Sequence, residues 1–210
     1  MVETTSKDMG NRPGTAVQRK GRERVEKILD AATELLIQEG HGQFTMRQLA
    51  ERLSIRLSNL QYYFSSREQL IQKILQRFLE SSMQEITSLS AKKNGSPRKR
   101  LLDAVDYLIK DQETESSCKI FWELWALSAR DEKVGQTMAD FYKTYCNTLR
   151  EMLQDLNPEL PPRKVGRIAV LVISMIEGLS LMRGFGKQRH THLQGIEKEL
   201  REAILRLIDA

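Results

Sequence analysis

The stretch from Thr45 to Phe64 constrains the fold of this chain more than any other. Gln48 follows Thr45 at the spacing of a capping box, which satisfies the first free amides of a helix. Apolar residues recur at helical spacing on both sides of Ser54. These residues are Met46, Leu49, Ala50, Leu53, Ile55, Leu60 and Phe64. We therefore predict two short helices joined by a tight turn and held together by these apolar side chains.

The free face of the second short helix carries side chains suited to contact with DNA. It displays Leu57, Ser58, Asn59, Gln61 and Tyr63. Amide groups can hydrogen-bond to base edges, and an apolar side chain can contact the methyl group of thymine. A helix held by its back, with such a front, is what insertion into a major groove requires. The stretch thus predicts a helix-turn-helix that reads DNA.

The remainder of the chain predicts further helices and no strands. Sustained apolar alternation is absent, and no hairpin turn lies between apolar runs. Helical periodicity predicts helices over residues 22–39, 66–89, 97–109, 118–129, 132–156, 163–183 and 193–208. The polar run 110–117 is expected to be a loop. With the two short helices this gives an all-α fold of about nine helices.

The predicted helix over 163–183 is apolar nearly all round, so it must be covered on two sides. Its polar interruptions at Ser174, Glu177 and Ser180 make it fall short of a membrane span, and no membrane partner is expected. The helices over 163–183 and 193–208 resemble half of a four-helix bundle between two subunits. The alternative, that they only close the core of one subunit, stays open.

Charge and cysteine usage fit a DNA-binding protein of the cytoplasm. The formal net charge is +5, and residues 7–24 hold six basic side chains against two acidic ones. An N-terminal arm over 1–20 is therefore expected to be flexible and basic, either contacting phosphates or the minor groove or remaining a solvated tail. Cys118 and Cys146 are solitary, which predicts neither a disulfide framework nor a thiolate metal site. The N-terminus lacks an apolar signal core, so we expect a cytoplasmic protein.

Signatures of enzymes are absent from the sequence. There is no nucleophile elbow, no zinc-protease motif and no glycine-rich phosphate loop. His190 and His192 could hold a metal ion, but a solvated loop is the simpler interpretation. We therefore expect no catalytic residues, no cofactor and no metal.

Three segments carry a resemblance to a known family: RVEKILDAATELLIQEG, FTMRQLAERL and LSNLQYYFSSREQLIQKIL. Together they cover about residues 24–75 without gaps. The chain resembles the tetracycline-repressor family of bacterial transcription regulators. More weakly, FWELWALSARDEKV and VISMIEGLSLMRG look like the sensing domain of the choline-responsive repressor subgroup. The resemblance implies a DNA-binding domain over 21–66, followed by a domain over 67–210 that senses a ligand and dimerises through the last two helices.

Carried over by position, the resemblance implies a set of residues that contact DNA. They are Thr45, Arg47, Gln48, Leu57, Ser58, Asn59, Gln61, Tyr62, Tyr63 and Arg67. Thr45, Tyr63 and Arg67 suit phosphate oxygens, and Arg47 suits guanine or the backbone. Tyr62 is expected to divide its ring between packing and a backbone contact.

The chain departs from the family's usual pattern at three positions of the motif. Ser54 stands where the family usually has glycine, so a left-handed backbone there has a cost. Arg56 replaces the usual serine that caps the recognition helix, and Gln61 replaces a tyrosine. We therefore expect the fold to be kept and the operator sequence to be particular to this protein.

Candidate ligand-binding residues combine aromatic faces with polar groups in the predicted body of the molecule. They are Tyr107, Cys118, Phe121, Trp122, Glu123, Trp125, Tyr142, Tyr145, Met175, Glu177 and Arg183. For each aromatic residue, simple packing is the alternative. Glu177 is the sharper candidate, because a carboxylate inside an apolar helix needs a partner, either an arginine such as Arg183 or a cationic ligand. A pocket of Trp122 and Glu177 would favour a cation or an amphipathic aromatic compound.

Together these features predict a homodimeric regulator that binds double-stranded operator DNA of pseudo-palindromic sequence. The expected mode is a repressor released by a small-molecule effector, whose identity is unknown. Two other classes stay open. One is a DNA-binding or architectural protein without a ligand, and the other is a helical enzyme or adaptor.

Overall fold

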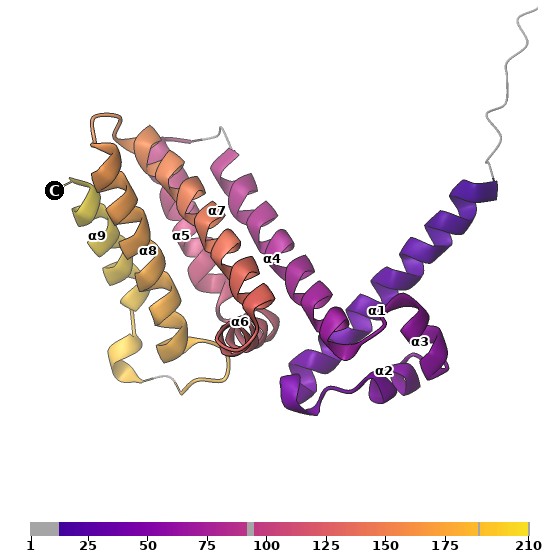
Figure 1. Ribbon diagram of the computed structural model, residues 1–210. Helices are drawn as coiled ribbons and strands as arrows, with labels where there is room; N and C mark the ends of the chain where they lie inside the picture. Colours follow the sequence, from indigo (N-terminus) through magenta and orange to yellow (C-terminus); the bar gives the residue numbers. More distant parts are fainter. Residues whose placement is uncertain (1–12, 92–94, 189, 210) are drawn as a thin grey trace, which may run out of the picture.

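The computed structural model describes residues 13–91, 95–188 and 190–209 of the chain. These described residues form nine α-helices and no strand (Figure 1). The all-α prediction is therefore confirmed. The helices are α1 (Pro13–Gln43), α2 (Met46–Arg52), α3 (Leu57–Tyr63), α4 (Arg67–Ala91), α5 (Pro97–Asp111), α6 (Glu115–Ser128), α7 (Glu132–Leu156), α8 (Pro162–Arg183) and α9 (Ile196–Asp209), with a short 3-10 turn at Thr191–Leu193 before the last. Figure 1 shows a small head of α1–α3 and a larger body of α5–α9, with α4 running from one to the other.

The helix-turn-helix forms as its sequence predicts. The Thr45 hydroxyl accepts a hydrogen bond from the Gln48 amide at 3.2 Å, and the Gln48 side chain accepts one from the Thr45 amide at 3.0 Å. This confirms the capping box. Ser54 turns the corner with φ 52°, the one positive φ outside glycine in the described part of the chain. Behind it, Leu49 and Leu60 are fully buried and hold α3 against α2.

Two arginines of α4 fasten the head to the body. Arg77 donates hydrogen bonds to Glu26 at 3.1 Å and to Asp30 at 2.8 Å, both on α1. Arg67 donates from Nε to the Phe44 carbonyl oxygen at 2.8 Å. Because these bonds lie at the start of α4 and along it, a movement of α4 must be transmitted to the head.

The body is a bundle in which α7 packs against α4, α6 and α8. Its centre is aromatic, since Phe141 and Tyr145 of α7 are both buried. The last helix, α9, closes the bundle by burying Leu200, Ile204 and Ile208 against α5 and α8. In Figure 1, α8 and α9 lie at the side of the body farthest from the head.

Helix α8 leaves much of its apolar surface uncovered. Among the described residues it is the one helix whose length and composition would allow it to cross a membrane, although the core helix of a soluble protein passes the same test. It packs against α5, α7 and α9 through buried residues such as Val165 and Val172. Its opposite face exposes large apolar side chains. Within the single chain, α8 is therefore covered on one of the two sides that were predicted to be covered.

Three segments differ from their predicted bounds. Helix α1 begins at Pro13, so residues 13–20 are helical and not a flexible arm, whereas residues 1–12 lie outside the described part. The predicted loop over 110–117 shrinks to residues 112–114, because Thr114 caps α6 by accepting a bond from the Ser117 amide at 3.3 Å. Helix α9 begins at Ile196, after a turn at Gly195 with φ 75°.

Candidate functional site

The residues predicted to contact DNA lie on α2, on α3 and at their ends, and most of their side chains are exposed. The exposed ones are Thr45, Arg47, Gln48, Ser58, Asn59, Gln61 and Tyr62. Leu57 and Tyr63 are half-buried. Tyr62 is 83% exposed, and its ring meets the Tyr63 ring edge-on with 5.2 Å between the two centroids. The expectation that the Tyr62 ring is half packed is therefore wrong. The structure thus gathers a polar and aromatic face along α3.

Arg67 does not extend toward this face. Its guanidinium donates to the Phe44 carbonyl oxygen and to the His41 carbonyl oxygen, and its side chain is only 25% exposed. These bonds satisfy two carbonyl groups of the connection between α1 and α2. The guanidinium therefore helps to hold the head together, and the role of Arg67 in phosphate binding stays a prediction.

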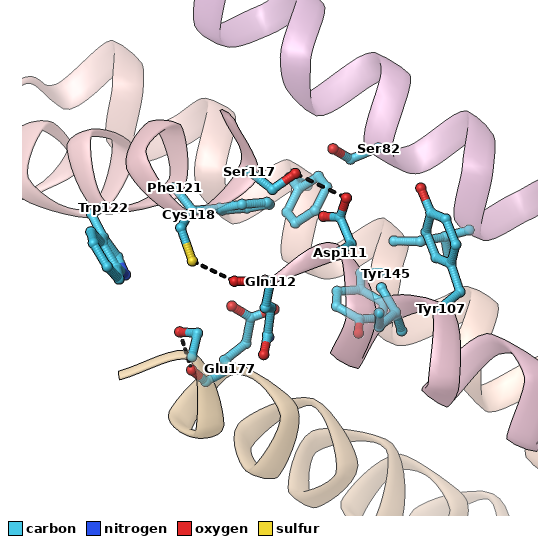
Figure 2. A pocket seen from close by; sticks show the side chains of 14 residues that line it. Ser82, Tyr107, Asp111, Gln112, Ser117, Cys118, Phe121, Trp122, Tyr145 and Glu177 are labelled. Carbon is cyan, nitrogen blue, oxygen red and sulfur yellow. Dashed lines mark hydrogen bonds between the residues drawn. The ribbon is translucent and has the colours of Figure 1, made fainter. Parts of the chain in front are cut away.

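The body contains a narrow cavity among α4, α5, α6, α7 and α8 (Figure 2). It is lined by Ser82, Ile86, Tyr107, Leu108, Asp111, Gln112, Ser117, Cys118, Phe121, Trp122, Phe141, Tyr145, Glu177 and Ser180. The space open to the centre of a water-sized molecule is about 40 Å³, enough for a few water molecules. Any organic ligand must therefore push side chains or helices apart to enter.

Six of the predicted ligand-binding residues line this cavity. They are Tyr107, Cys118, Phe121, Trp122, Tyr145 and Glu177. Sequence reasoning missed Asp111 and Gln112, because the run that contains them was expected to be a loop. The available signal was spacing, since Asp111 lies one helical turn after Tyr107 on α5.

Five predicted ligand-binding residues do not line the cavity. They are Glu123, Trp125, Tyr142, Met175 and Arg183. Trp125 is half exposed, and its ring centroid lies 5.4 Å from that of Tyr142. The Tyr142 ring in turn stacks on the Tyr145 ring, with 6.5 Å between the centroids. Met175 packs at the edge of the core. For Trp125 and Met175 the alternative of simple packing fits, whereas the Tyr142 hydroxyl lies close to Glu177 of the cavity.

Glu123 points away from the cavity, toward the head. Its carboxylate lies against Gly40, where an added Cβ would come within 3.2 Å of Oε1. Gly40 has φ 71° and interrupts α1 where the sequence predicted its end. On the same side of α6, the Lys119 ammonium donates to the Ile37 carbonyl oxygen at 3.1 Å. Helix α6 therefore touches the end of α1 with one face and the cavity with the other.

Arg183 pairs with residues other than Glu177. It is 2% exposed and its guanidinium binds Glu113 at 2.5 Å and Glu197 of α9. It also donates to the Ile109 carbonyl oxygen at 3.4 Å. The predicted pair of Arg183 and Glu177 is thus wrong, and Arg183 fastens the end of α8 to α5 and α9.

The cavity is lined by two partly buried carboxyl groups, those of Glu177 and Asp111. Burial raises the pKa of Glu177 to about 7, a change that the nearby Tyr142 hydroxyl partly opposes and the Asp111 carboxyl reinforces. The Tyr142 hydroxyl nevertheless makes no hydrogen bond of ordinary length. Burial also raises the pKa of Asp111, against a 2.9 Å hydrogen bond that its carboxylate accepts from the Ser117 hydroxyl. Both carboxyl groups are therefore harder to ionise than the same groups in water.

Several buried polar atoms around the cavity lack a hydrogen-bond partner among the described residues. They are Gln112 Oε1, Trp122 Nε1 and the hydroxyl groups of Tyr142 and Tyr145. Buried polar atoms without partners are costly and mark places where a ligand or a water molecule can bind. Among the described lining residues there is no lysine or arginine. Aromatic walls, two carboxyl groups and no internal cation suit a positively charged ligand.

Metal binding finds no support in the described part of the chain. It contains no group of three or more histidine, cysteine or acidic side chains placed to hold a metal ion. His190 and His192 lie at the start of the connection into α9, with their side chains exposed.

Comparison with protein families matches both parts of the chain. Residues 28–74 match the DNA-binding domain of bacterial regulatory proteins of the tetR family. Residues 97–209 match the C-terminal domain of BetI-type transcriptional repressors. An uncharacterized HTH-type transcriptional regulator in the dhlA 5′ region of Xanthobacter autotrophicus is 36% identical over 166 residues, which are 77% of this chain and 80% of that protein.

Solved structures share the fold at lower sequence identity. A TetR transcription regulator from Haloarcula marismortui has a TM-score of 0.70 and 16% identity, over 90% of this chain and 97% of that one. A protein described as a transcriptional regulator from Saccharomonospora viridis, in complex with choline, has a TM-score of 0.70 and 16% identity, over 90% and 96%. The family matches and the relative in Xanthobacter identify a DNA-binding regulator and not an enzyme. This chain belongs to the TetR family of bacterial transcriptional regulators, with a C-terminal domain of the BetI type.

Proposed function

We propose that this regulator is a homodimeric repressor in the bacterial cytoplasm, which leaves a pseudo-palindromic operator when a small organic cation occupies the cavity of the body. The observation that carries the proposal is the cavity itself. Glu177 and Asp111 place two carboxyl groups among aromatic walls, and α6 links that cavity to the head.

The DNA-binding half of the proposal rests on the exposed face of α3. Asn59 and Gln61 offer amides that can pair with the edge of adenine, and Leu57 can meet a thymine methyl group. Arg47 and Tyr63 carry groups that suit phosphate oxygens of the sugar–phosphate backbone. Two such heads about 34 Å apart would enter successive major grooves on one side of the duplex. This arrangement requires a dimer.

The exposed face of α8 supports dimerisation through α8 and α9. Its apolar side chains Val170, Leu171, Leu181 and Met182 are between 48% and 63% exposed in the single chain. Single exposed apolar residues are ordinary, but a row of them along one helix marks a contact surface. A second copy related by a twofold axis would bury this row against its own equivalent.

The effector class follows from the chemistry of the cavity wall. A cation gains from the faces of Trp122, Phe121 and Tyr145, and it supplies the charge that Glu177 needs in order to ionise. The fold relative from Saccharomonospora viridis was solved with choline, a quaternary ammonium compound. We infer that the effector here carries a positive charge and a hydrogen-bonding group that reaches Gln112 Oε1.

Helix α6 gives the coupling a physical route. Phe121 and Trp122 face the cavity, whereas Lys119 and Glu123 of the same helix face the end of α1. Because the space open to the centre of a water-sized molecule is only about 40 Å³, a ligand that enters must displace α6 or its neighbours. Displacement of α6 would shift α1 and change the spacing of the two heads, which lowers operator affinity.

The proposal is tested by operator selection followed by titration. DNA sequences enriched from a random pool give the operator and its symmetry, and a fluorescence titration then measures its affinity with choline chloride or with sodium chloride at the same ionic strength. The salt control is needed because protein–DNA affinity falls with ionic strength. We expect choline to weaken operator binding beyond the salt control. Tight choline binding with unchanged operator affinity would exclude the proposed release.

A DNA-binding protein without a ligand remains the second candidate, favoured by the small volume of the cavity. It predicts that no cation changes operator affinity. An architectural protein would in addition bind selected and random DNA equally well, which competition between the two DNAs measures directly.

A further inference from the structure

The segment that follows α8 contacts two residues that line the cavity, Gln112 and Cys118. The Phe185 amide donates to the Gln112 carbonyl oxygen at 3.2 Å and to Cys118 Sγ at 3.2 Å. The Cys118 thiol in turn donates to the same Gln112 carbonyl oxygen at 2.6 Å (Figure 2). The two bonds of Phe185 tie residues 184–187, here called the strap, to the junction of α5 and α6, and the thiol bond lies within that junction.

The strap is positioned closely at both of its ends. An added Cβ at Gly184 would lie 2.4 Å from the Ser180 carbonyl oxygen and 2.7 Å from Cys118 Sγ, so only glycine allows this approach. Just before it, Arg183 is buried and held by carboxylates of Glu113 and Glu197. Gly186 has φ 73°, a conformation that favours glycine and turns the chain back over α6.

The strap brings a positive charge to the aromatic wall of the cavity. The Lys187 ammonium lies 4.7 Å from the centroid of the Trp122 ring. That distance is within the range of cation–π attraction. Trp122 is also a lining residue of the cavity, with its indole Nε1 buried and without a partner among the described residues. The indole therefore already contacts a cation that belongs to the chain itself.

We propose that Lys187 is a built-in competitor of the cationic effector. This inference rests on the proposed function and deepens it, because it names the residue that sets how much cation is needed. An effector on the same face of Trp122 must displace the ammonium of Lys187. An effector on the opposite face shares the ring with a like charge and is repelled through it. In both cases Lys187 weakens binding, so only a cation that also satisfies Glu177 and Asp111 fills the cavity at low concentration.

The competition also connects the cavity to the dimer surface. Release of Lys187 from Trp122 would loosen the strap, which leads from α8 directly to the connection into α9. Since α8 and α9 form the proposed contact between subunits, effector binding would change the structure at that contact as well as at α6.

Calorimetric titration of the full-length protein with choline chloride tests the inference. The variants are Lys187→Gln, which removes the charge, and Lys187→Arg, which keeps it. Lys198→Gln is the matched control, because it removes an exposed lysine of α9 that pairs with Glu202 of its own helix. We expect Lys187→Gln to bind choline about two- to fivefold more tightly. Lys187→Arg and Lys198→Gln should keep the affinity of the wild type.

The possible results separate this inference from the proposed function. Equal affinities in the wild type and Lys187→Gln would overturn the competitor role and leave the cationic effector in place. Weaker binding by Lys187→Gln, or equal tightening in Lys198→Gln, would overturn it too. Choline binding to none of the four proteins would overturn both proposals. Because Lys187 is exposed, unchanged melting temperatures should show that every variant is folded.

Discussion

The polar groups of the head and those of the cavity differ in exposure and in hydrogen bonding. In the head, the capping box of Thr45 and Gln48 and the bonds of Arg67 satisfy the backbone internally, while Asn59 and Gln61 remain exposed. In the cavity, the polar groups of Gln112 and Tyr145 are buried without partners in the described structure. A DNA-binding site can leave its hydrogen-bonding groups hydrated. A site for a small molecule instead buries these groups, and the bound ligand then satisfies them.

The largest effect is expected from a substitution in the core of the head. Leu60 is fully buried between α3 and α2, so Leu60→Ala should lower the free energy of unfolding of the head by about 2–5 kcal/mol. Operator binding should be lost. Hydrogen exchange is expected to rise in α2 and α3 but not in α7, and choline binding should persist. Ile204→Ala, an equally buried change in α9, is the control that should spare the head.

Glu177→Gln should separate stability from ligand binding. The pKa of Glu177 is about 7 in the folded protein against an ordinary 4.5, so the unfolded chain ionises first as the pH rises. The penalty for burying the charge therefore grows between about pH 4.5 and 7 and is complete above pH 7. Removal of the carboxyl group should stabilise the protein at pH 8, by at most roughly 3 kcal/mol, and have little effect near pH 4.

The same variant should bind choline more weakly, since its cavity lacks the ionised partner. In the wild type, choline affinity should fall as the pH drops below about 7, because binding then requires Glu177 to lose a proton. Urea unfolding and calorimetry at several pH values measure both effects. Exposed Glu199→Gln is the matched control, and a pH profile of choline affinity identical in wild type and Glu177→Gln would remove Glu177 from the site.

On the DNA side, Asn59→Ala tests the reading face without touching the core. Loss of one good base contact costs about 1–3 kcal/mol of discrimination. Affinity for the selected operator should fall accordingly, while affinity for random DNA should hardly change. An equal loss on both DNAs would show that Asn59 contacts the backbone and not a base. Choline affinity in the absence of DNA serves as the internal control.

Lys119→Met tests the link between the two regions. Removal of the 3.1 Å bond to the Ile37 carbonyl oxygen should leave operator affinity and choline affinity near their wild-type values when each is measured alone. The factor by which choline weakens operator binding should shrink, with an effect of about 0.5–2 kcal/mol. Lys143→Met, at an exposed position of α7, should keep the full factor. An unchanged factor in Lys119→Met would move the coupling to another contact.

Ser54→Gly should produce the smallest effect. Ser54 has φ 52°, which glycine adopts without the steric cost that a side chain brings. The gain is partly offset by the greater freedom of glycine in the unfolded chain. We expect stabilisation of the head by roughly 0.5 kcal/mol, measurable by thermal unfolding. A destabilised variant would mean that the serine side chain has a role in the turn.

The two regions also differ in how much of them could be predicted from the sequence. The head depends on local spacing, so Thr45, Gln48, Leu49 and Leu60 were sufficient to predict the motif and its exposed face. The cavity depends on which faces of five helices meet, and helical periodicity does not encode that. Asp111 was therefore missed, although it lies one turn beyond Tyr107.

Long charged side chains were the least predictable part. Arg67 and Arg183 were each expected at a binding site, but each is folded back onto backbone carbonyl groups or buried carboxylates. Glu123 was expected in the cavity and instead contacts the head. A long side chain can reach groups from several elements, so its partner depends on tertiary packing and not on its position in the sequence.

The central claim is that the cavity and the head are thermodynamically coupled, and linkage allows a direct test. Choline affinity is measured by calorimetry on the free protein and on the protein saturated with its selected operator at constant ionic strength. We expect choline to bind the DNA complex more weakly, by the same factor by which choline weakens operator binding. Equal choline affinities in the free and DNA-bound protein would contradict it.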